Sequence, residues 1–157
     1  AWRIFKGMIP EDEHIDLIKA YNKRLFGASP SDQEKFSRAW TSWENALASL
    51  KSLGFGFVAS TEYAKAFARI ENHYFLNKGF LDSNSQIERD LYKISGIPAT
   101  IVQGRYDMIT PPWIADKLHR QLPKSKLLLI PEAGHAMSEP GITEALIMAT
   151  EETKNNL

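Results

Sequence analysis

Apolar side chains recur at helical spacing through the first half of the chain. The clearest stretch runs from Ser31 to about Leu50, where five large apolar residues follow one another at steps of four, three, four and three: Phe36, Trp40, Trp43, Leu47 and Leu50. This spacing places them on one face of a helix. Similar patterns predict a helix that begins at Pro10 and stops at Gly27, and another from near Thr61 to Gly79.

Two of these helices carry more specific signals. Ser31 and Glu34 have the spacing of a capping box, which predicts that they satisfy backbone N–H groups at the helix start. The expected inner stripe of the third helix is Phe67, Ile70 and Tyr74, and an adjoining stripe comprises Ala64, Ala68, Glu71 and Phe75. Residues 53–57, made of Gly, Phe and Leu, are expected to connect the second and third helices.

The second half of the chain changes to short apolar runs, which are typical of buried strands. Residues 99–103 and 126–130 are such runs. The segment between them predicts a helix that is capped by Thr110, has Pro111 in its first turn, and is buried through Ile114, Leu118 and Leu122. A last helix is expected to open at Pro140. Alternation of strands with helices predicts an α/β fold with a parallel sheet.

Polar side chains follow the carboxyl ends of both predicted strands. Gly104 ends the first strand and Asp107 lies on the loop beyond it, while the loop after the second strand presents His135. In open α/β sheets, catalytic groups and ligands gather in the crevice at this end of the strands. An acid followed by a histidine is also the order of the last two members of an α/β-hydrolase triad. We therefore expect Asp107 and His135 to approach each other as catalytic residues. The alternatives are a turn-capping Asp and a surface His.

The first member of such a triad is missing, because no G-x-S-x-G nucleophile elbow and no H-G-G-type oxyanion segment occurs. Ala1 is not an initiator Met, and no strand-turn-helix unit opens the chain. We therefore interpret the chain as the C-terminal part of an α/β-hydrolase with an incomplete parallel sheet. Residues 1–82 would form a helical cap region, and residues 83–157 the C-terminal portion of the core. Such a fragment is expected to be inactive alone.

Longer motifs point to one family. Trp40-Thr41-Ser42-Trp43-Glu44 and the run from Ala68 to Phe75 (A-R-I-E-N-H-Y-F) resemble the cap helices of the proline iminopeptidases, and G-R-Y-D and Gly134-His135 resemble the C-terminal core of an α/β-hydrolase. The resemblance extends from about Ile9 to Thr150. It implies a serine exopeptidase that releases proline from the N-terminus of peptides, with Asp107 and His135 as catalytic residues. It also implies cap carboxylates that bind the protonated amine of the substrate, and we assign this role to Glu44 and Glu71.

Other interpretations stay open for the two acids and for the function. Glu44 and Glu71 would ordinarily be solvated helix acids, although both adjoin aromatic stripes. The chain is alternatively a non-catalytic fragment that self-associates or binds peptides, or part of another capped α/β-hydrolase such as an esterase or epoxide hydrolase. An unpaired sheet edge and uncovered apolar faces predict a homo-oligomer.

Composition excludes several other classes. Lys+Arg and Asp+Glu both number 19, so the formal net charge is zero and no global field draws the chain to nucleic acid or an anionic membrane. Without Cys, disulfides and thiolate nucleophiles are excluded. Four scattered His without an H-E-x-x-H motif, and the lack of a phosphate-binding glycine loop, predict no metal and no cofactor. The start lacks the features of a signal peptide and no apolar run approaches a membrane span, so the expected place is the cytoplasm.

Overall fold

The computed structural model describes residues 1–50 and 59–155, and these divide into two compact units. The first unit comprises two stretches of the chain, Ala1–Ala46 and Leu53–Asp82. The second comprises Ser83–Leu157 and a short stretch that begins at Leu47. The predicted connection at residues 53–57 lies outside the described residues.

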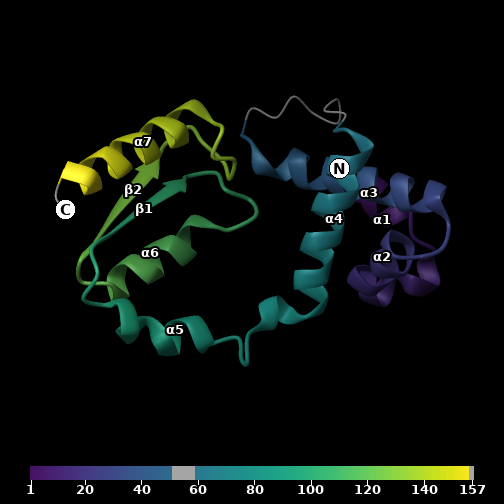
Figure 1. The fold of residues 1–157 in the computed structure, drawn as a ribbon, viewed down its shortest axis with the longest axis horizontal. Coiled ribbons are helices and arrows are strands. Elements are labelled where there is room, and N and C mark those ends of the chain that lie inside the picture. Colours follow the sequence, from purple (N-terminus) through teal and green to yellow (C-terminus); the bar gives the residue numbers. More distant parts are fainter. Residues whose placement is uncertain (51–58, 156–157) are drawn as a thin grey trace. The chain divides into compact units, whose positions relative to one another are not determined.

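The first unit is helical throughout its regular structure (Figure 1). Its elements are α1 (Trp2–Gly7), the 3-10 helix η1 (Glu11–Asp16), α2 (Leu17–Leu25), α3 (Pro30–Ala48), α4 (Thr61–Leu76) and the 3-10 helix η3 (Lys78–Phe80). The α-helix expected from Pro10 begins only at Leu17, where the Asp16 carboxylate accepts a hydrogen bond from Lys19 N at 3.0 Å. An N-cap aspartate satisfies a backbone donor of the first turn, and this places the start of α2 after a 3-10 segment.

The N-cap of α3 is Ser29 and not Ser31. The Ser29 hydroxyl accepts a hydrogen bond from Asp32 N at 3.2 Å. Glu34, the predicted second half of a capping box, instead accepts a hydrogen bond from the Thr61 hydroxyl at 2.9 Å. The capping-box prediction is therefore wrong, because a long-range partner on α4 takes the carboxylate that a local cap would have used.

Aromatic rings fill the core of the first unit. The Tyr21 ring stacks on Phe5 with centroids 4.3 Å apart, and its buried hydroxyl donates to Phe5 O at 2.7 Å. Trp40, which is fully buried, meets both rings edge-on at 5.6 and 5.4 Å, and Trp43 stacks on Phe5 at 4.4 Å. Such pairs contribute about 0.5–1.5 kcal/mol each beyond the burial of their surface. The predicted apolar stripe of α3 thus contributes Phe36, Trp40 and Trp43 to the core of this unit, whereas Leu50 lies beyond the end of α3 and is exposed.

Small residues, and not the predicted aromatic stripe, form the inner face of α4. Ala64, Ala68 and Asn72 are buried, whereas Ile70 and Tyr74 are 61% and 52% exposed. The expected stripe is therefore wrong at Ile70 and Tyr74, although Phe67 packs against the core, and the alanines of the adjoining stripe are buried. Small side chains let the α4 backbone approach its neighbours closely. The spacing of large apolar residues does not reveal this, because it gives little weight to alanine.

Two polar side chains attach α4 to α2. Asn72, which is fully buried, donates to Ile18 O at 2.9 Å and accepts from the Asn22 amide at 2.8 Å. Arg69 donates to Leu25 O at 2.9 Å and so satisfies a carbonyl at the end of α2. The run from Ala68 to Asn72 therefore serves to join the two helices.

The second unit is an α/β arrangement. It contains α5 (Gln86–Asp90), the 3-10 helix η4 (Leu91–Ile94), β1 (Ala99–Gly104), α6 (Pro112–Gln121), β2 (Ser125–Ile130) and α7 (Pro140–Asn155). The two strands pair in parallel, from Ala99 opposite Ser125 to Gly104 opposite Ile130. Figure 1 shows α6 and α7 on opposite sides of this pair, and both helices contact both strands. The predicted α/β fold with an incomplete parallel sheet is confirmed for the described residues.

The helix between the strands starts later than predicted. α6 begins at Pro112, and Thr110 lies in the preceding turn. Ala115 and Leu122 are buried, whereas Ile114, which was expected to be inside, is 45% exposed. The N-cap is Pro111, one position after the predicted cap, so the inner face of the first turn is also displaced.

The fold predicts that Asn72→Ala destabilises the first unit. The substitution removes a buried amide and leaves its two partners, the Asn22 amide and the Ile18 carbonyl, each short of a hydrogen bond, which costs about 1–3 kcal/mol. Urea unfolding followed by circular dichroism should show a lower midpoint. The control is Asn77→Ala, because Asn77 is exposed and bonds only within the end of α4. Equal midpoints for the two variants would contradict the role assigned to Asn72.

Candidate active site

The end of β1 delivers Asp107 into the space beyond the two strands. The turn after Gly104 is tied to the neighbouring loop, because Tyr106 N donates to Ala133 O at 2.9 Å. Gly104 is required for this approach, since a Cβ there would overlap the carbonyl oxygen of Gly134 and lie 2.7 Å from that of Ala133. Two backbones that touch in this way bring the loop after β1 against the loop after β2.

The Asp107 carboxylate is buried and fully occupied by donors. Its Oδ1 accepts from the N–H groups of Ile109 at 2.9 Å and Thr110 at 2.8 Å, and its Oδ2 from the Thr110 hydroxyl at 2.8 Å and the Gln103 amide at 3.1 Å. Burial raises the pKa of Asp107, but the hydrogen bonds from Thr110, His135 and Ile109 outweigh it, and the pKa lies below its ordinary value. The side chain is therefore an anion at neutral pH.

His135 lies against this anion. Its Nδ1 is 2.9 Å from Asp107 Oδ2 and 3.2 Å from the Thr110 hydroxyl. The carboxylate accepts only, so it selects the tautomer with a proton on Nδ1 and leaves the Nε2 lone pair available as a base. The His135 side chain is 41% exposed, and within residues 1–50 and 59–155 nothing hydrogen-bonds its Nε2. The structure thus brings together the two residues that the sequence placed on neighbouring loops.

Glu44 and Glu71, in the first unit, both adjoin Trp40. The Trp40 indole N–H donates to Glu71 Oε2 at 2.6 Å. Glu44 follows Trp40 by one turn of α3 and is only 6% exposed, so it is not the solvated helix acid that its residue type would suggest. Trp40 itself is part of the core, whereas Tyr74, on α4, is 52% exposed.

The sequence did not identify the residues that support Asp107. Thr110 was predicted as a helix cap, but its N–H and hydroxyl both bind the Asp107 carboxylate. Gln103, on β1, adds a third kind of donor. The available signal was local: an Asp followed by a Thr three residues later can close a hydrogen-bonded turn on itself.

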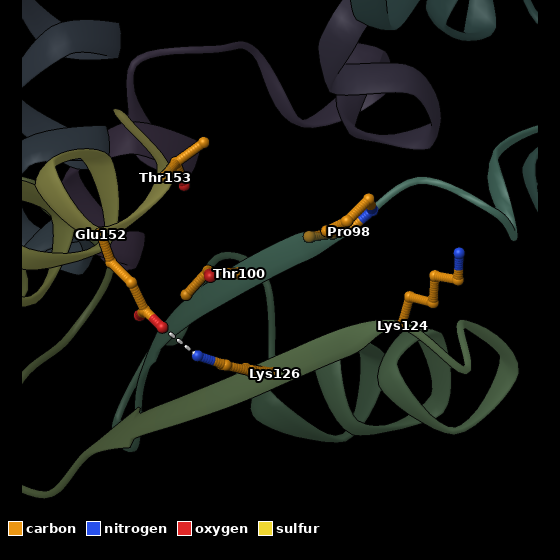
Figure 2. A pocket seen from close by; sticks show the side chains of 7 residues that line it. Pro98, Thr100, Lys124, Lys126, Glu152 and Thr153 are labelled. Atoms are coloured by element: carbon orange, nitrogen blue, oxygen red, sulfur yellow. Dashed lines mark hydrogen bonds and ion pairs between the residues drawn. The ribbon is translucent and has the colours of Figure 1, made fainter. Parts of the chain in front are cut away.

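A hollow at the opposite end of the strands carries different chemistry (Figure 2). Pro98, Ala99, Thr100, Lys124, Lys126, Glu152 and Thr153 line it. Lys126 forms an ion pair with Glu152 across the hollow. It lies at the amino ends of the strands, away from the edge where functional groups of parallel sheets collect. We therefore place the candidate active site at Asp107 and His135.

Among the residues that the structure describes, no group of three or more His, Asp or Glu side chains is arranged to hold a metal ion. No helix there has the length and hydropathy needed to cross a membrane.

Comparisons with known proteins connect this geometry to a family. Residues 80–147 match the family described as TAP-like protein, which corresponds to the C-terminal region of α/β-hydrolases. A probable proline iminopeptidase of Leptolyngbya boryana is 43% identical over 96% of this chain and 48% of its own length. The proline iminopeptidase of Arabidopsis thaliana is 43% identical over 98% of this chain and 41% of its own length, and that of Neisseria gonorrhoeae is 37% identical over 96% and 48%.

The chain is related to the proline iminopeptidases. The resemblance inferred from the two helical motifs and the Asp and His loops is therefore confirmed. The chain spans about half the length of the curated relatives it matches. The roles of Asp107, His135, Glu44 and Glu71 stay predictions, since the comparisons concern whole chains and not single residues.

The lowered pKa of Asp107 predicts a pH-dependent contribution to stability. A carboxyl whose pKa is lower in the folded state stabilises the fold above its unfolded pKa, and this contribution is lost as the pH falls through the folded pKa. Asp107→Asn should therefore reduce the melting temperature near neutral pH. The difference from the wild type should shrink between about pH 5 and about pH 2. Asp116→Asn, at a partly exposed position on α6, is the control. A difference that does not change with pH would contradict the ionised state assigned to Asp107.

Proposed function

We propose that the chain forms the part of a serine exopeptidase that carries the acid and the histidine of the triad, and that this enzyme releases N-terminal proline from peptides. Residues 1–82 would be the cap and residues 83–157 the C-terminal portion of the core. The observation that carries the proposal is the contact between His135 Nδ1 and buried Asp107, which leaves Nε2 available as a base. The relationship to proline iminopeptidases over nearly the whole chain supports it.

The chemistry follows from the tautomer. In acyl transfer, Nε2 of His135 takes the proton of a serine hydroxyl while the serine oxygen bonds to the carbonyl carbon of the scissile peptide. The imidazolium then gives that proton to the leaving amine, and water repeats the sequence to release the acyl group. Asp107 keeps the ring oriented and stabilises the imidazolium. Since the sequence contains no nucleophile elbow, we propose that the serine belongs to another part of the complete enzyme and that this chain is inactive alone.

Recognition of a free N-terminal proline is assigned to the first unit. A secondary ammonium group carries a positive charge and two N–H groups, and two carboxylates can each accept a hydrogen bond from one of them. Glu44 is buried, and Glu71 accepts from the Trp40 indole, so both acids lie beside the aromatic core of the first unit. An internal proline carries no charge to pair with these acids, which would restrict the enzyme to chain ends.

A chimaera tests this function. The chain would replace the half that it matches in the Leptolyngbya boryana relative, and the product would be assayed with a prolyl-arylamide and a simple aryl ester. We expect the chimaera to cleave the arylamide, and His135→Asn to lower kcat by about 10³-fold or more. Glu44→Gln and Glu71→Gln should weaken cleavage of the prolyl substrate far more than cleavage of the ester, because only the former presents an amine.

The controls separate the alternatives. Glu62→Gln, on the exposed first turn of α4, should change the cleavage rate of neither substrate. Equal losses on both substrates for the Glu44 and Glu71 variants would assign these acids a structural role. A chimaera that cleaves esters but shows no preference for N-terminal proline would instead support another capped α/β-hydrolase. Turnover by the chain alone would contradict its dependence on a separate nucleophile.

A second proposal concerns self-association of this chain. Leu128 and Leu129 on β2 are 38% and 42% exposed, and Trp113 on α6 and Met148 on α7 are 65% and 64% exposed. Strands at a sheet edge present unpaired N–H and C=O groups, and exposed apolar surface favours burial against another chain. We propose that these features make the isolated chain a homodimer or a higher oligomer.

Sedimentation velocity at about micromolar concentration tests this proposal. We expect a dimer or larger species. Leu129→Lys should shift the population towards the monomer, since a charged edge opposes strand pairing. Thr150→Lys, at an exposed polar position of α7, should leave the distribution unchanged. A monomer for the wild type with a single cooperative melt would contradict the proposal.

A further inference from the structure

The loop that carries His135 is held by backbone atoms on two sides. The N–H groups of His135 and Ala136 both donate to Ala48 O, each at 2.7 Å. A Cβ added at Gly134 would lie 3.0 Å from the same Ala48 oxygen, and one added at Gly104 would overlap Gly134 O. The loop therefore lies between the end of β1 and the end of α3 with no room for an intervening side chain. Its position is fixed by what holds these backbones together.

A single carboxylate connects both sides of the loop. Glu139 Oε2 accepts from Gly134 N at 2.7 Å, and Glu139 Oε1 accepts from Leu50 N at 2.6 Å. Leu50 follows the end of α3, 89 positions earlier in the chain. Hydrogen bonds from neutral N–H groups to a carboxylate are shorter and stronger than those between neutral groups. The Glu139 carboxylate thus joins the residue before His135 to the segment on which the loop rests.

The backbone of Glu139 is itself fixed. Its carbonyl oxygen accepts from Thr143 N at 2.9 Å in the first turn of α7, and its N–H donates to Ala136 O at 3.0 Å. The Thr143 hydroxyl donates to Met137 O at 2.6 Å and secures the far side of the same loop. The side chain of Glu139 therefore projects from a rigid helix start and transmits that rigidity to Gly134.

We propose that Glu139 is a positioning residue for His135, which acts by holding Gly134 and Leu50 and never touches the substrate. Its consequence for catalysis rests on the proposed function, but the structural effect does not. The 2.9 Å contact between His135 and Asp107 depends on the position of the loop that carries His135. The simpler alternative is that the Glu139 carboxylate only stabilises α7 through its charge near the N-terminal end of the helix dipole. That role would leave the His135 ring unaffected.

The effect on the ring distinguishes these roles. In ¹⁵N-labelled full-length chain, the Nδ1 proton of His135 should give a low-field signal that is protected from exchange with water. Glu139→Gln keeps the size of the side chain, but its amide group has one acceptor for two N–H donors. We expect exchange of the His135 Nδ1 proton to become roughly two- to tenfold faster, as for the loss of one hydrogen bond. His14 and His119 serve as internal references, and Glu144→Gln, exposed on α7, is the matched control.

Amide exchange in the wild type makes the test independent of the variant's folding. Leu50 is 41% exposed, so slow exchange of its N–H together with that of Gly134 would support the carboxylate bridge. Free exchange at Leu50, or an unchanged His135 signal in a folded Glu139→Gln chain, would overturn the proposal. In the chimaera, Glu139→Gln should lower kcat with little change in KM, and Glu139→Asp should restore part of the loss. An inactive parent chimaera would refute the proposed function while leaving the exchange results on Glu139 valid.

Discussion

The close approach of two glycine backbones is the constraint on which the candidate active site depends. A Cβ on Gly104, at the end of β1, would overlap the carbonyl oxygen of Gly134 in the loop after β2, and a Cβ on Gly134 would crowd the backbone of Ala48 and Leu50. This approach sets Asp107 beside His135 and presses the His loop against the end of α3. A pair of catalytic groups must be held to a fraction of an ångström, and backbone against backbone is a stiff way to achieve it.

One set of polar groups around this contact binds the Asp107 carboxylate, and another holds the loop that carries His135. Hydrogen bonds from Thr110, His135 and the N–H of Ile109 hold the Asp107 carboxylate ionised in spite of its burial. Glu139 accepts a hydrogen bond from Gly134 N and so holds the loop that carries His135. The anion selects one histidine tautomer, and the unused ring nitrogen faces away from it. An acid, a base and their supports are thus all present in the second unit, while the nucleophile elbow is not in the sequence.

The first unit shows how an aromatic core can carry acidic side chains. Trp40 is fully buried among Phe5, Tyr21 and Phe36, yet its indole N–H needs an acceptor and finds Glu71. Glu44, one turn further along α3, is also buried. An acid that is placed against buried aromatics has lost part of its hydration, which is the condition under which it binds a cation strongly. On the basis of the relationship to proline iminopeptidases, we propose that the cation is the amine of an N-terminal proline.

The sequence by itself determined the periodic elements and the chain order of the polar groups. Helical spacing identified α3 and its core face, and two short apolar runs identified β1 and β2, because burial imposes a fixed period on each kind of element. Only the tertiary structure decided the partners. Ser29 caps α3 while Thr61 donates to Glu34, the alanine face of α4 is packed where Asn72 binds α2, and Thr110 serves Asp107 instead of capping α6. The contacts of Glu34 and of Asn72 join side chains far apart in the sequence, about which local spacing carries no information, whereas at Thr110 two local hydrogen-bonding patterns competed and the buried carboxylate decided between them.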